Sequence, residues 1–142
     1  MGDRQQHRNI HGGPRRAVCL YAQECLDALR AEGHTIAPGL AGENVTIAGL
    51  TWVAVSVGDR VRIGDEVELE ITGYAAPCRA NAQWFSDGDY ERLSQKRHPG
   101  WSRLYACVVQ AGTIRQGDVV AHRQGCMTTK KAVGAVEEDV PV

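Results

Sequence analysis

The sequence lacks any apolar run that approaches the roughly 20 residues of a membrane-spanning helix. Its first ten residues, MGDRQQHRNI, contain no hydrophobic stretch of the kind found in a secretory signal. The formal net charge of -1 leaves no excess of either sign, and such a balance does not favour nucleic acid or a membrane surface as a partner. We therefore expect a cytoplasmic protein that binds neither.

Paired cysteines are also missing. The chain has five cysteines, an odd number, and they form no C-x-x-C pair, so the usual spacing of a structural zinc site is absent. In a reducing compartment we expect them to be free thiols. They stand at Cys19, Cys25, Cys78, Cys107 and Cys126.

The 142 residues that are present are enough for one domain with a sizeable core. Residues 1–10 are polar and are expected to be mobile. Residues 11–123 carry the regular apolar patterns and form the expected domain. From residue 124 to residue 142 the periodicity ends and charges gather, which predicts a flexible C-terminal tail.

A helix is predicted from Pro14 to Glu32. Pro14 suits the first helical position, and Gly33 suits the position after the last turn. Between them, apolar residues recur at helical spacing and would face the core. These residues are Val18, Tyr21, Ala22, Cys25 and Leu29, with Cys19 near the edge of the stripe.

The remaining apolar segments predict short strands. One is expected over Asn44–Ile47, and alternation with a period of two predicts two more. The same-face residues are Val53, Val55 and Val57 in the first of these, and Val67, Leu69 and Ile71 in the second. Many short strands separated by Gly-Asp turns indicate a mainly β fold, a barrel or a sandwich, with helices attached.

The stretch YAAPCRA, residues 74–80, places Cys78 directly after a proline at the end of a predicted strand. Pro77 has no N–H to donate, so strand pairing should end there. If residues 79–85 form a helical turn, Cys78 stands at its positive end and Arg79 adds a cation; both favour the thiolate. Cys78 is therefore the candidate nucleophile, sulfur carrier or soft-metal ligand, and the alternative is an inert packing cysteine.

Other residues could assist that thiol. His11 precedes a Gly12-Gly13 turn, where the exposed N–H groups of a helix start can hold an anion. Arg15, Arg16 and Arg103 could bind a phosphate. On the sequence alone the alternative is favoured, in which these arginines are solvated surface cations and His11 is a loop histidine.

Four blocks in order resemble the MOSC domain, which is similar to the C-terminal part of molybdenum cofactor sulfurases. They are HGGPRRAVCLY, GLAGENVTIAGL, VGDRVRIGDEVELEITGYAAPC and HPGWSRLYACVVQAGTIRQGDVV. The resemblance extends from about His11 to Val120 and suggests a small stand-alone member. It implies a compact, closed β-barrel of short, mostly antiparallel strands with a few peripheral α-helices.

The resemblance also implies a chemistry centred on Cys78. In this family the cysteine of the Pro-Cys motif is the functional thiol, thought to carry sulfur as a persulfide taken from a pyridoxal-phosphate-dependent, cysteine desulfurase-like partner. Better-studied relatives bind the molybdenum–pterin cofactor, with a cysteine thiolate on the metal, and reduce N-hydroxylated compounds. The chain would thus carry sulfur in molybdenum cofactor or metal–sulfur metabolism, with a molybdoenzyme or redox partner. The alternatives are a molybdenum-dependent reductase and a non-catalytic binding module.

The matched positions extend the expected site, and the cofactor-binding candidates bordering Cys78 are His11, Gly12, Gly13, Glu43, Asn44, Arg79, Arg103 and Tyr105. The chain carries no desulfurase domain, so pyridoxal phosphate is not expected in it. It also shows no cysteine spacing of an iron–sulfur cluster.

Overall fold

The structure is a computed structural model, and it describes residues 7–10, 17–125 and 138–141. These residues form a mainly β protein with few helices. The elements in chain order are β1 (His7–Ile10), β2 (Ala17–Ala22), α1 (Gln23–Ala31), β3 (Val45–Ile47), η1 (Trp52–Ala54), β4 (Arg60–Ile63), β5 (Val67–Tyr74), η2 (Arg79–Trp84), η3 (Tyr90–Leu93), β6 (Leu104–Gln110), β7 (Gly112–Arg115), β8 (Val119–Arg123) and β9 (Glu138–Pro141), where η marks a 3-10 helix.

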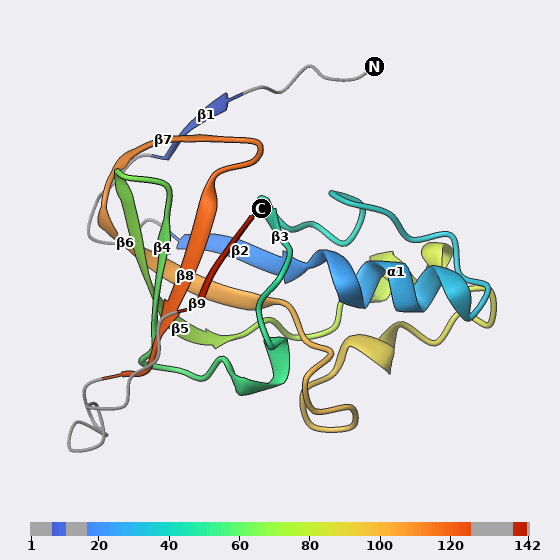
Figure 1. Cartoon of the computed structure of the whole chain (residues 1–142). Coiled ribbons are helices and arrows are strands. Elements are labelled where there is room, and N and C mark those ends of the chain that lie inside the picture. The colour runs from blue at the N-terminus through green and yellow to red at the C-terminus, as the bar shows by residue number, and fades with distance from the viewer. Residues whose placement is uncertain (1–6, 11–16, 126–137, 142) are drawn as a thin grey trace.

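Seven strands form one sheet in the order β3-β2-β6-β5-β4-β8-β9, and β1 pairs with β7 in a second, two-stranded sheet. β2 and β3 run parallel, whereas the other neighbouring strands run antiparallel. Figure 1 shows the strands on one side of the molecule, and α1 with η2 and η3 on the other. We call the larger sheet "the sheet", and residues 23–44 and 75–103 "the lobe".

The sheet is curled but open, so the expectation of a closed barrel is wrong. Its end strands, β3 and β9, are not paired with each other in the described part of the chain. Closure requires staggered pairing around the whole barrel. β3 has only three residues, and these pair with β2, so it offers too short an edge to complete the circle.

The helix predicted for Pro14–Glu32 is wrong over its first half. Residues 14–16 lie outside the described residues, Ala17–Ala22 form β2, and α1 covers only Gln23–Ala31. All of β2 after its first residue is buried, and because successive side chains of a strand point to opposite faces, both faces are covered. Such a strand has no polar side, so its apolar residues also fit a helical stripe.

The alternation predicted over β5 is confirmed, because Val67, Leu69 and Ile71 are buried. On its other face, Glu68 and Glu70 pair with Arg60 of β4 at 3.0 and 3.2 Å. The short strand expected over Asn44–Ile47 is also present, as β3.

The strand predicted around Val53, Val55 and Val57 is wrong. Residues 52–54 form η1, and the Val53 and Val57 side chains are 64% and 52% exposed. Trp52 is buried instead, and its Nε1–H donates to Ser102 O at 2.9 Å. This buried indole ties the segment to the lobe, so it does not pair as a strand.

The lobe contributes Leu26, Leu29, Ile36 and Leu93 to an apolar core that is continuous with that of the sheet. Its loops are held largely by polar side chains. The Tyr21 hydroxyl of β2, for example, donates to Trp101 O at 2.7 Å. Buried main-chain groups need partners, and in the lobe single side chains often supply them.

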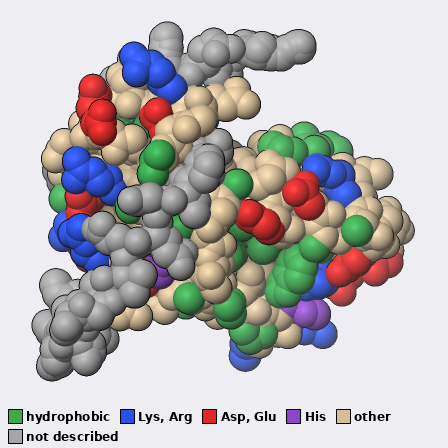
Figure 2. All heavy atoms as spheres, in the orientation of Figure 1, with side chains coloured by type: hydrophobic (Ala, Val, Ile, Leu, Met, Phe, Trp, Pro, Cys, Tyr) green, Lys and Arg blue, Asp and Glu red, His purple; other side chains and the backbone are tan. Residues whose placement is uncertain are grey.

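The surface carries both signs of charge. On the face shown in Figure 2, acidic and basic side chains are interspersed, which agrees with the formal net charge of -1. Within the described ranges, no helix has the length and apolar character to cross a membrane.

Candidate functional site

Cys78 lies where strand pairing stops. β5 ends at Tyr74, and the next residue still donates its N–H to Arg103 O at 3.0 Å. After Pro77 the chain turns into η2, with Cys78 as the extended residue before its first turn. The Cys78 carbonyl accepts from Asn81 N–H at 2.8 Å. The predicted strand end and the helical turn over residues 79–85 are thus confirmed, the turn being a short 3-10 helix.

The Cys78 thiol is accessible, unlike most of its counterparts. Of the four cysteines in the described part of the chain, Cys78 alone is exposed; Cys19 and Cys25 are buried, and Cys107 is partly buried. Arg79, next to Cys78, is exposed as well. The fifth cysteine, Cys126, lies outside the described residues.

Arg103 is buried between two loops of the lobe, with only 5% of its surface exposed. Its Nη1 group donates to Ala41 O and its Nη2 group to Ala76 O, each at 2.7 Å. Its Nε has no hydrogen-bond partner among the described residues. The guanidinium therefore joins the loop that leads to Glu43 with the loop that leads to Cys78.

Glu43 is buried in the first of these loops, 7% exposed. Its Oε2 accepts from Gly39 N–H at 2.7 Å and from the Thr46 hydroxyl at 3.1 Å. Its Oε1 has no partner within the residues that the structure describes. One carboxylate oxygen thus shapes the loop, and the other is left available.

Asn44 and Cys19 are joined by two hydrogen bonds, just before the first paired residues of the parallel strands β2 and β3. Asn44 N–H donates to Cys19 O at 2.7 Å, and Cys19 N–H donates to Asn44 Oδ1 at 2.8 Å. Burial raises the pKa of the Cys19 thiol; the Arg103 charge lowers this pKa and the Glu43 charge raises it. Cys19 therefore lies within electrostatic reach of both buried charges, a placement that its position in an apolar run did not reveal.

Tyr105 lies on β6 opposite Cys19 of β2 and Gly73 of β5. Its side chain is 43% exposed. A Cβ built on Gly73 would meet no heavy atom within 4 Å, so open space adjoins this position. Tyr105 therefore presents an accessible aromatic side chain beside Gly73, near the end of β5.

The structure brings several of the predicted site residues to one region. The loops of Glu43, Asn44 and Cys78 are joined through Arg103, Arg79 adjoins Cys78, and Tyr105 lies two residues along β6 from Arg103. His11, Gly12 and Gly13, and with them Arg15 and Arg16, lie outside the described residues. Among the residues described, no group of three or more His, Cys, Asp or Glu side chains is arranged to hold a metal ion.

Comparison with known proteins gives one family. Residues 7–121 match the model of the MOSC domain. YflK of Bacillus subtilis (strain 168) is 32% identical over 82% of this chain and 52% of its own length. YiiM of Escherichia coli (strain K12) is 31% identical over 75% of this chain and 49% of its own length. The chain thus spans about half the length of these two curated relatives.

Two further comparisons concern a named activity and a solved structure. A protein of Gibberella moniliformis (strain M3125 / FGSC 7600) named "Reductase" is 28% identical over 78% of this chain, but over only 20% of its own length. The crystal structure of YiiM from Geobacillus stearothermophilus has a TM-score of 0.62 at 26% identity, covering 80% of this chain and 58% of that one.

Proposed function

Because the chain belongs to the MOSC domain family, we propose that it carries sulfur on Cys78 and transfers it within molybdenum cofactor or metal–sulfur metabolism. The observation that carries this proposal is the exposure of Cys78 at the end of β5 while Cys19 and Cys25 are buried. Sulfur transfer between proteins needs a thiol that a second protein's sulfur can reach.

The chemistry of the buried thiols supports the choice of Cys78. Burial raises the pKa of Cys25 to about 11, and burial also raises the pKa of Cys19. Since the thiolate is the nucleophile, these two cysteines stay protonated near neutral pH and hidden from a partner. Cys78 does not share that burial.

The proposed step needs no external oxidant. The Cys78 thiolate attacks the outer sulfur of a persulfide on a cysteine desulfurase-like donor. The donor's S–S bond breaks, an S–S bond to Cys78 forms, and the donor cysteine leaves as a thiolate. Cys78 then holds a persulfide, which it passes to an acceptor such as a molybdoenzyme by the same exchange.

The test is a sulfur-uptake experiment on the full chain. Incubation with a cysteine desulfurase and cysteine should add about 32 Da, one sulfur atom, and the addition should disappear on reduction. Cys78→Ser should abolish the addition, and Cys107→Ser, the matched control at a partly buried thiol, should keep it. No added mass on wild-type Cys78 would contradict the proposal.

A second candidate is a molybdenum-cofactor reductase of N-hydroxylated compounds, favoured by the relative named "Reductase". The fit to the cofactor is mixed. Cys78 offers an exposed thiol, and a thiolate suits a soft metal centre. Both terminal nitrogens of Arg103 already bind carbonyls, so we assign the exposed Arg79 to a cofactor phosphate. When bound, the cofactor would supply the redox chemistry, while Cys78 would hold the metal.

Metal analysis separates the two candidates. Protein purified from a host that makes the cofactor should contain far less than one molybdenum per chain if Cys78 serves as a sulfur carrier. Stoichiometric molybdenum and pterin, lost together in Cys78→Ser, would favour the reductase. If wild-type Cys78 neither takes up sulfur nor holds molybdenum, and if it also reacts slowly with alkylating reagents, the chain is a non-catalytic binding module.

A further inference from the structure

The segment that carries Cys78, residues 75–86, is anchored at both ends. At the near end, Ala75 N–H donates to Arg103 O at 3.0 Å, and the Arg103 Nη2 group donates to Ala76 O at 2.7 Å. Ser102 Oγ also lies 3.3 Å from Ala75 O. Three contacts from two consecutive residues therefore hold the chain just before Pro77.

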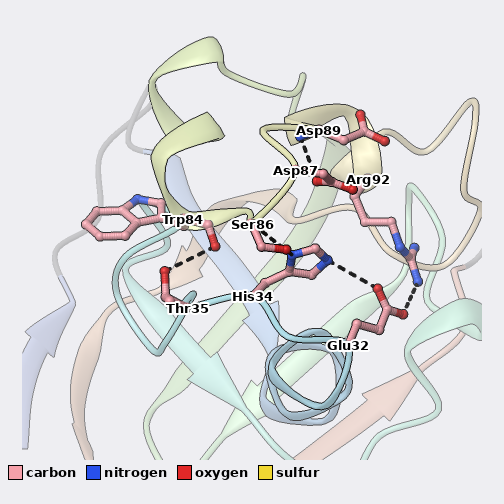
Figure 3. Close-up of polar contacts among 8 residues, drawn as sticks. All are labelled: Glu32, His34, Thr35, Trp84, Ser86, Asp87, Asp89 and Arg92. Atoms are coloured by element: carbon pink, nitrogen blue, oxygen red, sulfur yellow. Dashed lines mark hydrogen bonds and ion pairs between the residues drawn. The ribbon is translucent and has the colours of Figure 1, made fainter.

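The far anchor, drawn in Figure 3, lies at the end of η2 and just after it. Trp84 O accepts from Thr35 N–H at 2.9 Å and from the Thr35 hydroxyl at 3.3 Å. Ser86 N–H donates to His34 Nδ1 at 3.1 Å, and the His34 ring lies 4.9 Å from the ring of buried Phe85. Cys78 lies two residues from the near anchor and six from the far one, so the near anchor has the greater control over its position.

The near anchor also reaches the Glu43 loop. The same guanidinium donates to Ala41 O on one side and to Ala76 O on the other, both at 2.7 Å. A planar guanidinium spans two acceptors in a fixed geometry, whereas a lysine ammonium is a single point. Burying a cation is costly unless it is well bonded, yet Arg103 is 5% exposed and its Nε has no partner among the described residues.

We propose that Arg103 is a positioning residue: it holds the Cys78 segment at a fixed distance from the Glu43 loop, so that the thiol is presented to a partner's sulfur in one orientation. This rests on the proposed sulfur-carrier function of Cys78. It assigns to Arg103 a task different from binding a phosphate, because both terminal nitrogens are committed to main-chain carbonyls. Small misplacements of a reacting group lower rates steeply.

The test compares Arg103→Lys with Arg97→Lys, a matched change at an exposed arginine elsewhere in the lobe. Arg103→Lys should slow sulfur transfer from the donor to Cys78 by about tenfold or more, since a shift of about 1 Å can cost about 100-fold. Arg97→Lys should change this rate by less than about threefold, because its side chain is 62% exposed and the cation is retained. In Arg103→Lys, alkylation of Cys78 by a small neutral reagent should stay within about twofold of wild type, because such a reagent needs no orientation.

A purely structural role for Arg103 predicts a different pattern. In that case the lobe would loosen as a whole, and Cys25, whose thiol lies 3.6 Å from Gly100 O, would become open to alkylation. Sulfur transfer that stays within about twofold of wild type in Arg103→Lys, or a loss of transfer accompanied by alkylation of Cys25, would overturn the inference. If Arg103→Lys does not fold, Arg103→Gln, whose neutral amide cannot span both carbonyls, takes its place, and an unchanged transfer rate in that variant would overturn the inference too.

Hydrogen exchange tests the same inference without a sulfur donor. Arg103→Lys should speed amide exchange in residues 41–44 and 75–81 together, by about tenfold. His34→Ala should speed exchange only around residues 84–86. If wild type takes up no sulfur but these exchange patterns appear, the proposed function fails and the coupling of the two loops stands. If Arg103→Lys leaves exchange in both loops unchanged, the inference fails whatever the sulfur result.

Discussion

The sheet and the lobe satisfy their main chains in different ways. In the sheet, strands pair with strands: β5, for example, pairs with β4 over Val67–Glu70 and with β6 over Glu68–Tyr74. In the lobe, side chains bind loop amides and carbonyls: Arg103 binds two carbonyls, and Gln95 accepts from Gly100 N–H at 3.1 Å. A single substitution should therefore change local geometry in the lobe, but overall stability in the sheet.

This difference explains where the candidate site lies. Cys78 stands where the pairing of β5 gives way to contacts with Arg103. Repeated strand pairing gives rigidity and leaves few free positions, whereas loops on a rigid support carry function. The site therefore combines a strand end, which fixes Cys78 from one side, with side-chain anchors that hold it from the other.

The largest effect on stability is expected at the centre of the sheet. Leu69 on β5 is 1% exposed, and Leu69→Ala should lower the free energy of unfolding by about 3 kcal/mol, through lost burial and the cavity left behind. Val109→Ala, a control on β6 where the side chain is 46% exposed, should cost less than about 0.5 kcal/mol. Urea denaturation measures both. A similar cost for the two variants would mean that β5 is not the core of the sheet.

A buried carboxylate at the start of β4 should rank next. Asp59 accepts from Ser56 N–H, Gly125 N–H and His122 Nε2–H at 2.9, 2.9 and 2.8 Å. Asp59→Ala removes the acceptor of these three hydrogen bonds and should cost about 2 kcal/mol.

The control for Asp59 is Asp65→Ala in the exposed β4–β5 turn, where we expect a change within about 0.5 kcal/mol. Thermal and urea denaturation of both variants give the comparison. If the Asp59 variant were as stable as the Asp65 variant, the three hydrogen bonds would contribute nothing to stability. The edge of the sheet around Asp59 would then not depend on side-chain acceptors, unlike the lobe.

The sequence predicted the sheet better where one face of a strand meets water. Over β5 the alternation of Val67, Leu69 and Ile71 with glutamates admits one periodicity, and the strand follows. Ala17–Ala22 is covered on both faces, so its apolar residues fit a helix and a strand equally well. Local sequence patterns could not predict that the sheet is open, because closure into a barrel depends on how the two end strands meet.

The candidate site was predictable where local chain chemistry determines it. The main-chain pairing of β5 stops at Ala75, just before Pro77, and a helical turn follows, so Cys78 could be singled out from its neighbours alone. Arg103 could not be interpreted in the same way. A lone arginine after a loop is most often a surface cation, and its two carbonyl partners, Ala41 and Ala76, are apolar in sequence and distant along the chain.

A glycine contact in the lobe should have a moderate effect. Gly100 has φ +89°, and a Cβ there would lie 2.9 Å from Val53 Cγ2. Gly33 has φ +103° with no atom within 4 Å of such a Cβ, so Gly33→Ala reports the backbone cost alone, about 1 kcal/mol. Gly100→Ala should cost roughly 1 kcal/mol more than that, because of the overlap.

Removing the overlapping methyl groups gives the check on Gly100. In a double-mutant cycle, Val53→Ala should recover part of the loss in Gly100→Ala but none of the loss in Gly33→Ala. The same cost at both glycines, or recovery at both, would show that the packing of Val53 on Gly100 does not help to hold the lobe.

The smallest effect is expected for an ion pair on the surface of the lobe. A hydrogen bond from Arg92 is the main cause that lowers the pKa of Glu32 from its usual 4.5, and Arg92 Nη2 lies 2.9 Å from Glu32 Oε2. A lowered folded-state pKa adds stability above the unfolded-state pKa, and this stability is lost as the pH falls through the folded-state value. Because the Glu32 side chain is 43% exposed, Glu32→Gln should cost less than about 1 kcal/mol at pH 7. The difference in unfolding free energy between variant and wild type should close as the pH falls below 4.5, the usual pKa, and it should shrink in high salt.

Urea titrations at pH 7 and at about pH 3 measure this gap in stability, with Glu91→Gln at the more exposed Arg97 pair as the control. A gap that persists at the lower pH would contradict the prediction, because Gln keeps nearly the size and shape of Glu, and the charge of Glu32 would then not be what stabilises the lobe surface.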